Sequence, residues 1–308
     1  MDLALQTAGP YDAVLAAARW AEGRRLACFA LPDHYLRSTT PDGVGDPAYD
    51  AFVQAGGLAR ETTSIRLSML VSPVTFRHPA VLGKMAVTLD EMSAGRFSLG
   101  VGTGWLESEH EIFGLPFPER GERFDLLEEA LAYLRAMFDP ASPGFEGARF
   151  RLASQPVGPR PGPGLGLVVG GGGLHRTPEL AGRYADEFNV YVGPDMADRI
   201  ERARRAAETA GRDPDALLLS SAGAVVVGED DAAYRRRLEE MAAEEAIPVE
   251  ELEGRLEKRE VPRGSAAAAR AHLEQMAALG VQRFYVQIGV RGEFDPGPVA
   301  ETFDLLGG

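Results

Sequence analysis

A short set of residues combines a side chain that can transfer protons with loops that can bind an anion. His34 follows Asp33, directly after the apolar run Leu26–Leu31. Histidine titrates near neutral pH, so His34 can donate or accept a proton in a reaction. A histidine that only packs in the structure is the alternative, and the sequence leaves both readings open.

Two glycine-rich segments are candidates for ligand binding. Gly102-Thr103-Gly104 ends the apolar run Phe97–Val101, and without Cβ atoms a flat or anionic group can approach the backbone there. The run Gly170–Gly173 precedes a predicted helix, so its N–H groups can bind a phosphate, with Arg176 as an additional bidentate donor. Either segment can also be a simple turn.

Several other polar residues receive no chemical role from the sequence. The segment Arg77-His78-Pro79 is interpreted as the turn into the next helix, and His110 and His272 as residues on helical or loop surfaces. Glu107 and Glu109 are interpreted as solvated loop carboxylates. No group of His, Cys or Asp has the spacing of a metal site, so no metal is expected.

The elements that must position these residues alternate between short apolar runs and amphipathic helices. Eight runs are predicted strands: Leu3–Gln6, Leu26–Leu31, Ile65–Val71, Phe97–Val101, Leu165–Val169, Glu187–Val192, Leu217–Val227 and Phe284–Ile288. This order predicts an α/β fold, a (β/α)8 TIM barrel. A doubly wound sheet is less consistent, because Gly100, Gly102 and Gly104 do not have the Gly-x-Gly-x-x-Gly spacing of a dinucleotide site.

Helices are predicted between these runs, and two segments interrupt the alternation. The predicted helices are Tyr11–Glu22, Asp46–Glu61, Pro79–Gly95, Phe124–Phe138, one from about Pro178, a charged stretch broken at Pro248, and Ser265–Leu279. The interruptions, residues 106–121 and 139–164, are predicted to be insertion loops that cover part of the barrel mouth. The whole chain, residues 1–308, is therefore expected to be one barrel domain.

Composition excludes several classes of partner. A net charge of −14 over 308 residues argues against nucleic-acid binding, which needs a dense basic face. No apolar run reaches the roughly 20 residues that span a bilayer, and the first residues lack the features of a signal peptide. The single cysteine, Cys28, lies in an apolar run and is expected to be a buried small hydrophobe. We expect a soluble cytoplasmic protein without a membrane partner.

Three segments together resemble the bacterial luciferase-like monooxygenase superfamily. They are Phe76-Arg77-His78-Pro79 through Gly104-Trp105, the stretch Phe117–Phe124, and Gly170–Gly173 with the later Ala185-Asp186-Glu187. Within this superfamily the chain is most similar to the oxidoreductases that depend on the deazaflavin coenzyme F420. The resemblance covers about residues 3 to 290.

The resemblance implies a barrel, usually a homodimer, that holds F420 or FMN at the carboxyl ends of its strands. The positions implied for the cofactor phosphate are Gly170, Gly171, Gly172, Gly173, His175, Arg176 and Thr177. Met69, Leu70 and Ser72 are implied behind the ring, with a non-prolyl cis peptide near Met69–Leu70. Asp33 and His34 are implied beside the ring, and Gly102, Thr103 and Gly104 at the tip of the fourth strand.

One position departs from the pattern of the F420-dependent sugar-phosphate dehydrogenases. Those enzymes have a glutamate after the Gly-Thr-Gly turn, where this chain has Trp105. An apolar wall there suits a flat or hydrophobic substrate better than a sugar phosphate. The resemblance implies an F420-dependent oxidoreductase acting on a small organic molecule, with His34 as proton partner. The alternatives are an FMN-dependent monooxygenase that needs a separate flavin reductase, and a non-catalytic protein that binds flavin or deazaflavin.

Overall fold

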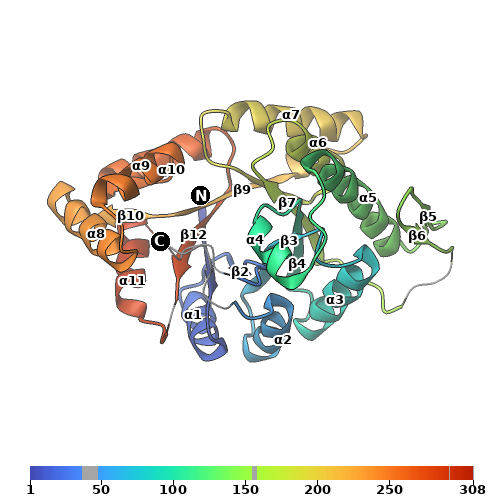
Figure 1. Ribbon diagram of the computed structural model, residues 1–308, viewed down its shortest axis with the longest axis horizontal. Helices are drawn as coiled ribbons and strands as arrows, with labels where there is room; N and C mark the ends of the chain where they lie inside the picture. The colour runs from blue at the N-terminus through green and yellow to red at the C-terminus, as the bar shows by residue number, and fades with distance from the viewer. Residues whose placement is uncertain (37–47, 155–157, 291, 308) are drawn as a thin grey trace.

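The computed structural model describes residues 1–36, 48–154, 158–290 and 292–307 and contains a closed barrel of eight parallel strands (Figure 1). Around the barrel the strands follow the order β1, β12, β9, β8, β7, β4, β3, β2. Their bounds are β1 Asp2–Ala8, β2 Cys28–Leu31, β3 Arg66–Pro73, β4 Phe97–Gly102, β7 Gly166–Gly171, β8 Glu187–Val190, β9 Leu218–Ala224 and β12 Arg283–Gly289. The predicted (β/α)8 TIM barrel is confirmed.

Helices surround the barrel, and most of them, though not Asp231–Glu244 and Val249–Lys258, bury one apolar face against it. They are α1 Tyr11–Gly23, α2 Ala51–Glu61, α3 Pro79–Met92, α5 Arg120–Phe138, α6 Arg176–Tyr184, α7 Met196–Thr209, α8 Asp231–Glu244, α9 Val249–Lys258, α10 Ala266–Ala278 and α11 Pro296–Leu306. In α5 the stripe Phe124, Leu127, Leu131 and Leu134 is buried, as its three- and four-residue spacing predicts. The predicted start of α2 at Asp46 lies outside the described residues.

The predicted insertion loops contain regular structure that the sequence did not indicate. The first loop forms a seven-residue helix, α4 Glu107–Phe113, which ends at Gly114 with a φ of 65°. The second contains a two-stranded hairpin beside α5, β5 Phe145–Glu146 and β6 Arg151–Leu152 (Figure 1). The prediction of irregular structure was wrong for these parts, and residues 155–157 of the second insertion lie outside the described residues.

The predicted seventh strand, Leu217–Val227, is two strands in two different sheets. β9 ends at Ala224, and β10 (Val226–Gly228) pairs instead with β11 (Arg263–Ser265) outside the barrel. Side chains of this small sheet and of helices α8 and α9 form a separate buried apolar cluster. It includes Val226, Leu238 and Leu252. Burial of Val226 in that second cluster explains why the apolar run continues past the end of the barrel strand.

Glycines on the inner side of β4 and β7 make room for an irregular segment of β3. The pairing of β3 with β4 shifts register between Met69 and Ser72, and Val71 turns toward the two glycine strands. A Cβ atom at Gly102 would lie 2.9 Å from Val71 Cγ2, and one at Gly170 would lie 3.2 Å from Val71 Cγ1. A non-prolyl cis peptide joins Leu70 to Val71, which confirms the prediction of one near Met69–Leu70 and places it one bond later in the chain.

The opposite, amino-terminal end of the barrel is filled by a buried polar cluster. Arg283 Nη1 lies 2.8 Å from Glu187 Oε2, and the Tyr285 hydroxyl donates to Glu187 Oε1 at 3.0 Å. Cys28 is buried in the same interior, where desolvation raises the pKa of its thiol to about 11. The thiol is therefore protonated at neutral pH, which confirms the prediction of a buried small hydrophobe.

Glu22 at the end of α1 fixes the turn that leads into β3. Its Oε1 accepts backbone N–H bonds from Thr63 at 2.8 Å, Ser64 at 2.5 Å and Ile65 at 3.1 Å. Burial alone would raise the pKa of Glu22, but these hydrogen bonds outweigh it and lower the pKa to about 2. The charged form is therefore favoured by folding.

Glu22→Gln is expected to lower the free energy of unfolding at pH 7 by about 1–2 kcal/mol, because the charge-assisted bonds weaken. The pKa of Glu22 is lower in the folded than in the unfolded protein. Its contribution to the free energy of unfolding is therefore complete above about pH 4.5 and is lost as the pH falls toward 2. Urea unfolding across this range measures it. Exposed Glu91→Gln is the control, and an equal stability loss in both variants would contradict the assignment.

Candidate functional site

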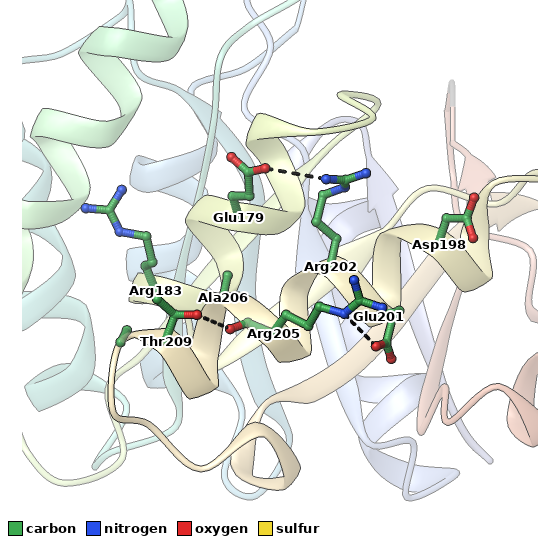
Figure 2. Close-up of a pocket in the computed structure, with 9 residues that line it drawn as sticks. Glu179, Arg183, Asp198, Glu201, Arg202, Arg205, Ala206 and Thr209 are labelled. Carbon is green, nitrogen blue, oxygen red and sulfur yellow. Dashed lines mark hydrogen bonds and ion pairs between the residues drawn. The ribbon is translucent and has the colours of Figure 1, made fainter.

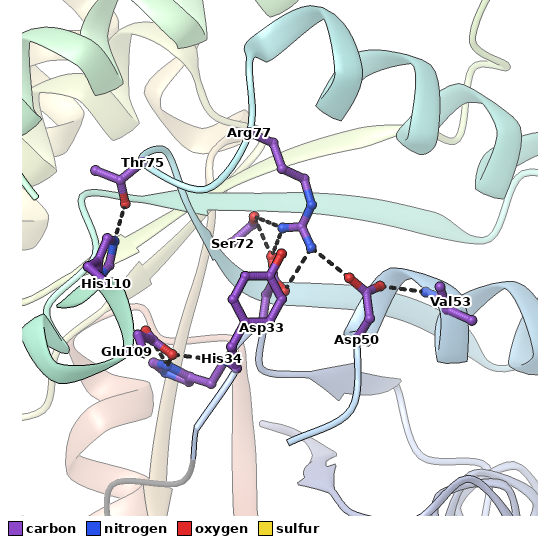
Figure 3. Close-up of polar contacts among 10 residues, drawn as sticks. Asp33, His34, Asp50, Val53, Ser72, Thr75, Arg77, Glu109 and His110 are labelled. Carbon is purple, nitrogen blue, oxygen red and sulfur yellow. Dashed lines mark hydrogen bonds and ion pairs between the residues drawn. The ribbon is translucent and has the colours of Figure 1, made fainter. Parts of the chain in front are cut away.

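Polar residues from the segments that end or follow β2, β3 and β4 meet at one edge of the barrel mouth, and the predicted residues Asp33, His34 and Ser72 are among them (Figure 3). Asp33 and His34 follow β2, Ser72 lies in β3, and Arg77 lies in the loop after β3. Helix α4 follows β4 and adds Glu109 to the same group. The strands run parallel, so residues far apart in the sequence are brought together at this edge.

Asp33 is the buried anchor of this group. Its side chain is fully buried; Ser72 Oγ donates to Asp33 Oδ2 at 2.6 Å, and Arg77 Nη1 contacts the same oxygen. Arg77 also lies 3.0 Å from Asp50 Oδ2 and 4.8 Å from the ring centre of Phe52. Burial raises the pKa of Asp33, while Arg77 and Ser72 oppose this shift. The Asp33 carboxylate therefore holds the loops after β2 and β3 together.

The segment Arg77-His78-Pro79 does more than form a turn. His78 caps α3, since its Nδ1 accepts the N–H of Ala80 at 3.1 Å, and Pro79 is the first residue of that helix. Arg77, however, reaches back to Asp33, 44 positions earlier in the chain. The prediction was therefore incomplete for Arg77, because nothing in the local sequence indicates its distant partner.

His34 pairs with Glu109, and Glu109 is not solvated as predicted. His34 Nδ1 lies 3.0 Å from Glu109 Oε1 and 3.3 Å from Oε2. The Glu109 side chain is fully buried and also accepts the N–H of Tyr35 at 2.9 Å. The ring of Trp105 meets His34 edge to face, with ring centres 5.6 Å apart. Asp33 and His34 are adjacent in sequence but have different partners.

His110 is also buried, so its predicted surface position was wrong. Its Nδ1 lies 2.8 Å from the carbonyl oxygen of Leu106, and its Nε2 lies 2.6 Å from Thr75 Oγ1. A carbonyl can only accept, so Nδ1 carries the proton and Nε2 accepts the hydroxyl of Thr75. The ring packs against Phe76 and Phe117. His110 therefore fastens α4 to the loop after β3 (Figure 3).

The glycine run forms an exposed backbone segment ahead of α6. Gly171 and Gly172 are exposed, and Gly171 has a φ of 140°, which residues with side chains rarely adopt. Gly173 is buried, and a Cβ atom there would lie 2.8 Å from the ring of Phe124 and in closer contact with Thr177. Without side chains these glycines allow an anion such as a phosphate to approach the backbone closely, in the segment that leads to α6.

Two residues predicted to bind the phosphate, Arg176 and His175, lie in different surroundings from the glycine run. Arg176 is engaged by α5, with Nη2 2.8 Å from Asp125 Oδ1 and 3.3 Å from Glu128 Oε2. Its Nη1 donates to the carbonyl oxygen of Gly121 at 3.2 Å. His175 precedes α6, is exposed and makes no capping hydrogen bond with its side chain. The structure therefore brings the glycines and Thr177 together and ties Arg176 to the neighbouring helix.

A cavity of about 630 Å³ lies outside the barrel between α6 and α7 and has a different character (Figure 2). Its charged side chains form pairs: Arg202 lies 3.7 Å from Glu179, and Arg205 lies 2.8 Å from Glu201. Exposed pairs of this kind contribute little energy and leave few free donors for a ligand. We therefore place the candidate site at the mouth.

Two further findings concern the part of the chain that the structure describes. No group of three His, Cys, Asp or Glu side chains there is arranged to bind a metal ion. None of the helices there has the length and apolar character needed to cross a bilayer.

Comparison with known proteins identifies one family and two kinds of relative. The family described as luciferase-like monooxygenase matches residues 2–301. The chain is 31% identical over 178 residues to pyrimidine monooxygenase RutA of Allorhizobium ampelinum, covering 55% of this chain and 48% of that protein. It is 32% identical over 187 residues to the F420-dependent glucose-6-phosphate dehydrogenase of Nakamurella multipartita, covering 57% and 54%. The alignments thus span about half the length of these relatives.

The fold also matches a solved structure along nearly its whole length. An F420-dependent secondary alcohol dehydrogenase, solved with an F420–acetone adduct, superposes with a TM-score of 0.78 at 18% identity. The match covers 99% of this chain and 98% of that one. At this identity the likeness concerns the fold alone.

Proposed function

Since the chain belongs to the luciferase-like monooxygenase family, we propose that it is an oxidoreductase that transfers a hydride between coenzyme F420 and a small organic substrate. The observation that carries the proposal is His34, a proton-transfer group held by buried Glu109 at the mouth of the barrel. In a (β/α)8 enzyme the loops at this end form the active site. The similarity to an F420-dependent glucose-6-phosphate dehydrogenase supports this choice of cofactor.

The residues around the mouth fit such a cofactor. The exposed residues Gly171 and Gly172, together with Thr177, would hold its phosphate. Leu70 and Val71 line the barrel interior and would form the floor under the ring. When bound, F420 supplies the hydride donor or acceptor at C5 of its ring. His34 would exchange a proton with the substrate.

Trp105 is the residue we assign to the substrate pocket. Its side chain is 63% exposed and meets the edge of His34, so it forms an apolar wall next to the proton-transfer group. Such a wall favours a flat or hydrophobic substrate over a sugar phosphate. We propose that Thr103 and Gly104 keep the backbone between β4 and Trp105 open to the cofactor, while Gly102, the last residue of β4, makes room for Val71 beneath it.

Gly172→Asp is expected to weaken F420 binding at least about tenfold, because it adds a negative charge where the phosphate would lie. The nearest atom to a Cβ at Gly172 is Cδ2 of Tyr191 at 4.0 Å, so the fold accepts a side chain. Fluorescence titration with F420 measures the dissociation constant. Gly172→Ala is the matched control and should bind F420 nearly as well as wild type. Equal affinity of the Asp variant and wild type would remove the glycine run from the site.

An FMN-dependent monooxygenase is the second candidate, supported by the similarity to pyrimidine monooxygenase RutA. The same mouth and glycine run would then hold FMN, and a separate flavin reductase would supply reduced cofactor. We also propose that the protein acts as a homodimer in the cytoplasm.

A further inference from the structure

We propose that Glu109 is a positioning residue, which sets the tautomer of His34 so that Nε2 is the nitrogen that exchanges a proton with the substrate. This inference rests on the proposed function for its catalytic meaning. Its structural content, the protonation pattern of His34, can be tested without any cofactor.

The contact between the two side chains defines which nitrogen carries the proton. A carboxylate oxygen accepts hydrogen bonds, so in the proposed pair Glu109 Oε1 accepts the hydrogen of His34 Nδ1, 3.0 Å away. In the neutral ring Nε2 is then the basic nitrogen. Nε2 has no hydrogen-bond partner among the described residues, and a quarter of the His34 side chain is exposed. The Glu109 side chain behind it is fully buried.

Three further contacts prevent the pair from rotating. The N–H of Tyr35 donates to Glu109 Oε2 at 2.9 Å, which fixes the carboxylate from its second side. Trp105 restricts rotation of the His34 side chain, because the two rings pack edge to face. The neighbour of Glu109, His110, ties α4 to Thr75, so the helix that carries the carboxylate is held independently of His34. Because the His34 ring is already held in place, no conformational entropy is lost in orienting it when the substrate reacts.

The residue directly after the Gly102-Thr103-Gly104 turn is Trp105, and the acid four positions later, Glu109, lies behind His34. The acid thus acts on the histidine rather than on the substrate.

The test is NMR of protein labelled with ¹⁵N-histidine, without cofactor and at a pH where His34 is neutral. Wild type is expected to show the Nδ1–H tautomer of His34, with the resonance assigned by its loss in His34→Ala. Glu109→Leu should shift the resonance toward the Nε2–H tautomer, while Glu109→Gln, which keeps an acceptor, should retain the wild-type form. Exposed Glu107→Gln on the same helix is the control and should change nothing. An Nε2–H tautomer in wild type would overturn the inference whether or not any variant folds.

A kinetic experiment distinguishes failure of this inference from failure of the proposed function. With F420 and an acceptor that wild type reduces, Glu109→Leu should lower kcat on the order of 10²-fold and leave KM nearly unchanged, and Glu109→Asp should recover part of the rate. Equal kcat in Glu109→Leu and wild type would overturn the positioning role. If wild type binds no F420, the proposed function fails, and the NMR result still decides the tautomer.

Discussion

Replacing Arg77 with leucine is expected to lower the free energy of unfolding at pH 7 by about 3–5 kcal/mol, the usual cost of leaving a buried charge without its partner. Asp33 is fully buried, and the side chain of Arg77 is only 9% exposed. Without Arg77, the hydroxyl of Ser72 is the one side-chain donor left to the Asp33 carboxylate among the residues that the structure describes. Urea unfolding followed by circular dichroism measures the loss.

Two comparisons show whether the loss comes from the Asp33–Arg77 pair. The double variant Asp33→Leu/Arg77→Leu should recover much of the stability, because no charge is then left unpaired. Asp50→Asn removes only the outer partner, whose side chain is 36% exposed, and should cost less than about 1 kcal/mol. Burial already raises the pKa of Asp33, and removal of Arg77 raises this pKa further. The loss of unfolding free energy in Arg77→Leu should therefore become smaller as the pH is lowered. A deficit that grows at low pH would contradict this account.

His34→Ala is expected to lower kcat by roughly 10²- to 10⁴-fold, the usual contribution of a positioned acid or base. The protein should keep its affinity for F420, because His34 is not among the groups that would hold the phosphate. Steady-state reduction of an acceptor found by screening carbonyl and unsaturated compounds gives the rate, and fluorescence titration gives the affinity. Thr75→Val, which removes the partner of His110 but not of His34, is a control for disturbance of α4. Unchanged kcat in His34→Ala would remove this residue from the mechanism.

The sequence was sufficient for the barrel because strands and helices that pack on a common core carry local patterns. Seven of the eight predicted strands match barrel strands, and each of their ends lies within two residues of the observed end, such as Phe97–Val101 against β4 Phe97–Gly102. The seventh could not be divided from its pattern, since Val226 is buried like the strand residues before it but in a second cluster. Helix α4 was missed because seven residues are too few for a clear helical period.

The site was predicted less completely, because its decisive contacts join distant residues. Asp33, His34 and the glycine run were found from residue type and from their place after apolar runs. The pairs Arg77–Asp33 and Glu109–His34 span 44 and 75 positions, and no local pattern indicates such a contact. Arg176 shows the reverse case: its place at the start of α6 suggests a phosphate ligand, but two carboxylates of α5 bind it.

Parallel equilibrium titrations of the purified protein with F420 and with FMN, followed by fluorescence, distinguish the two candidate cofactors. We expect saturable binding of F420 at micromolar or lower concentration and much weaker binding of FMN. Micromolar binding of FMN without binding of F420 would contradict this expectation and would favour the monooxygenase candidate.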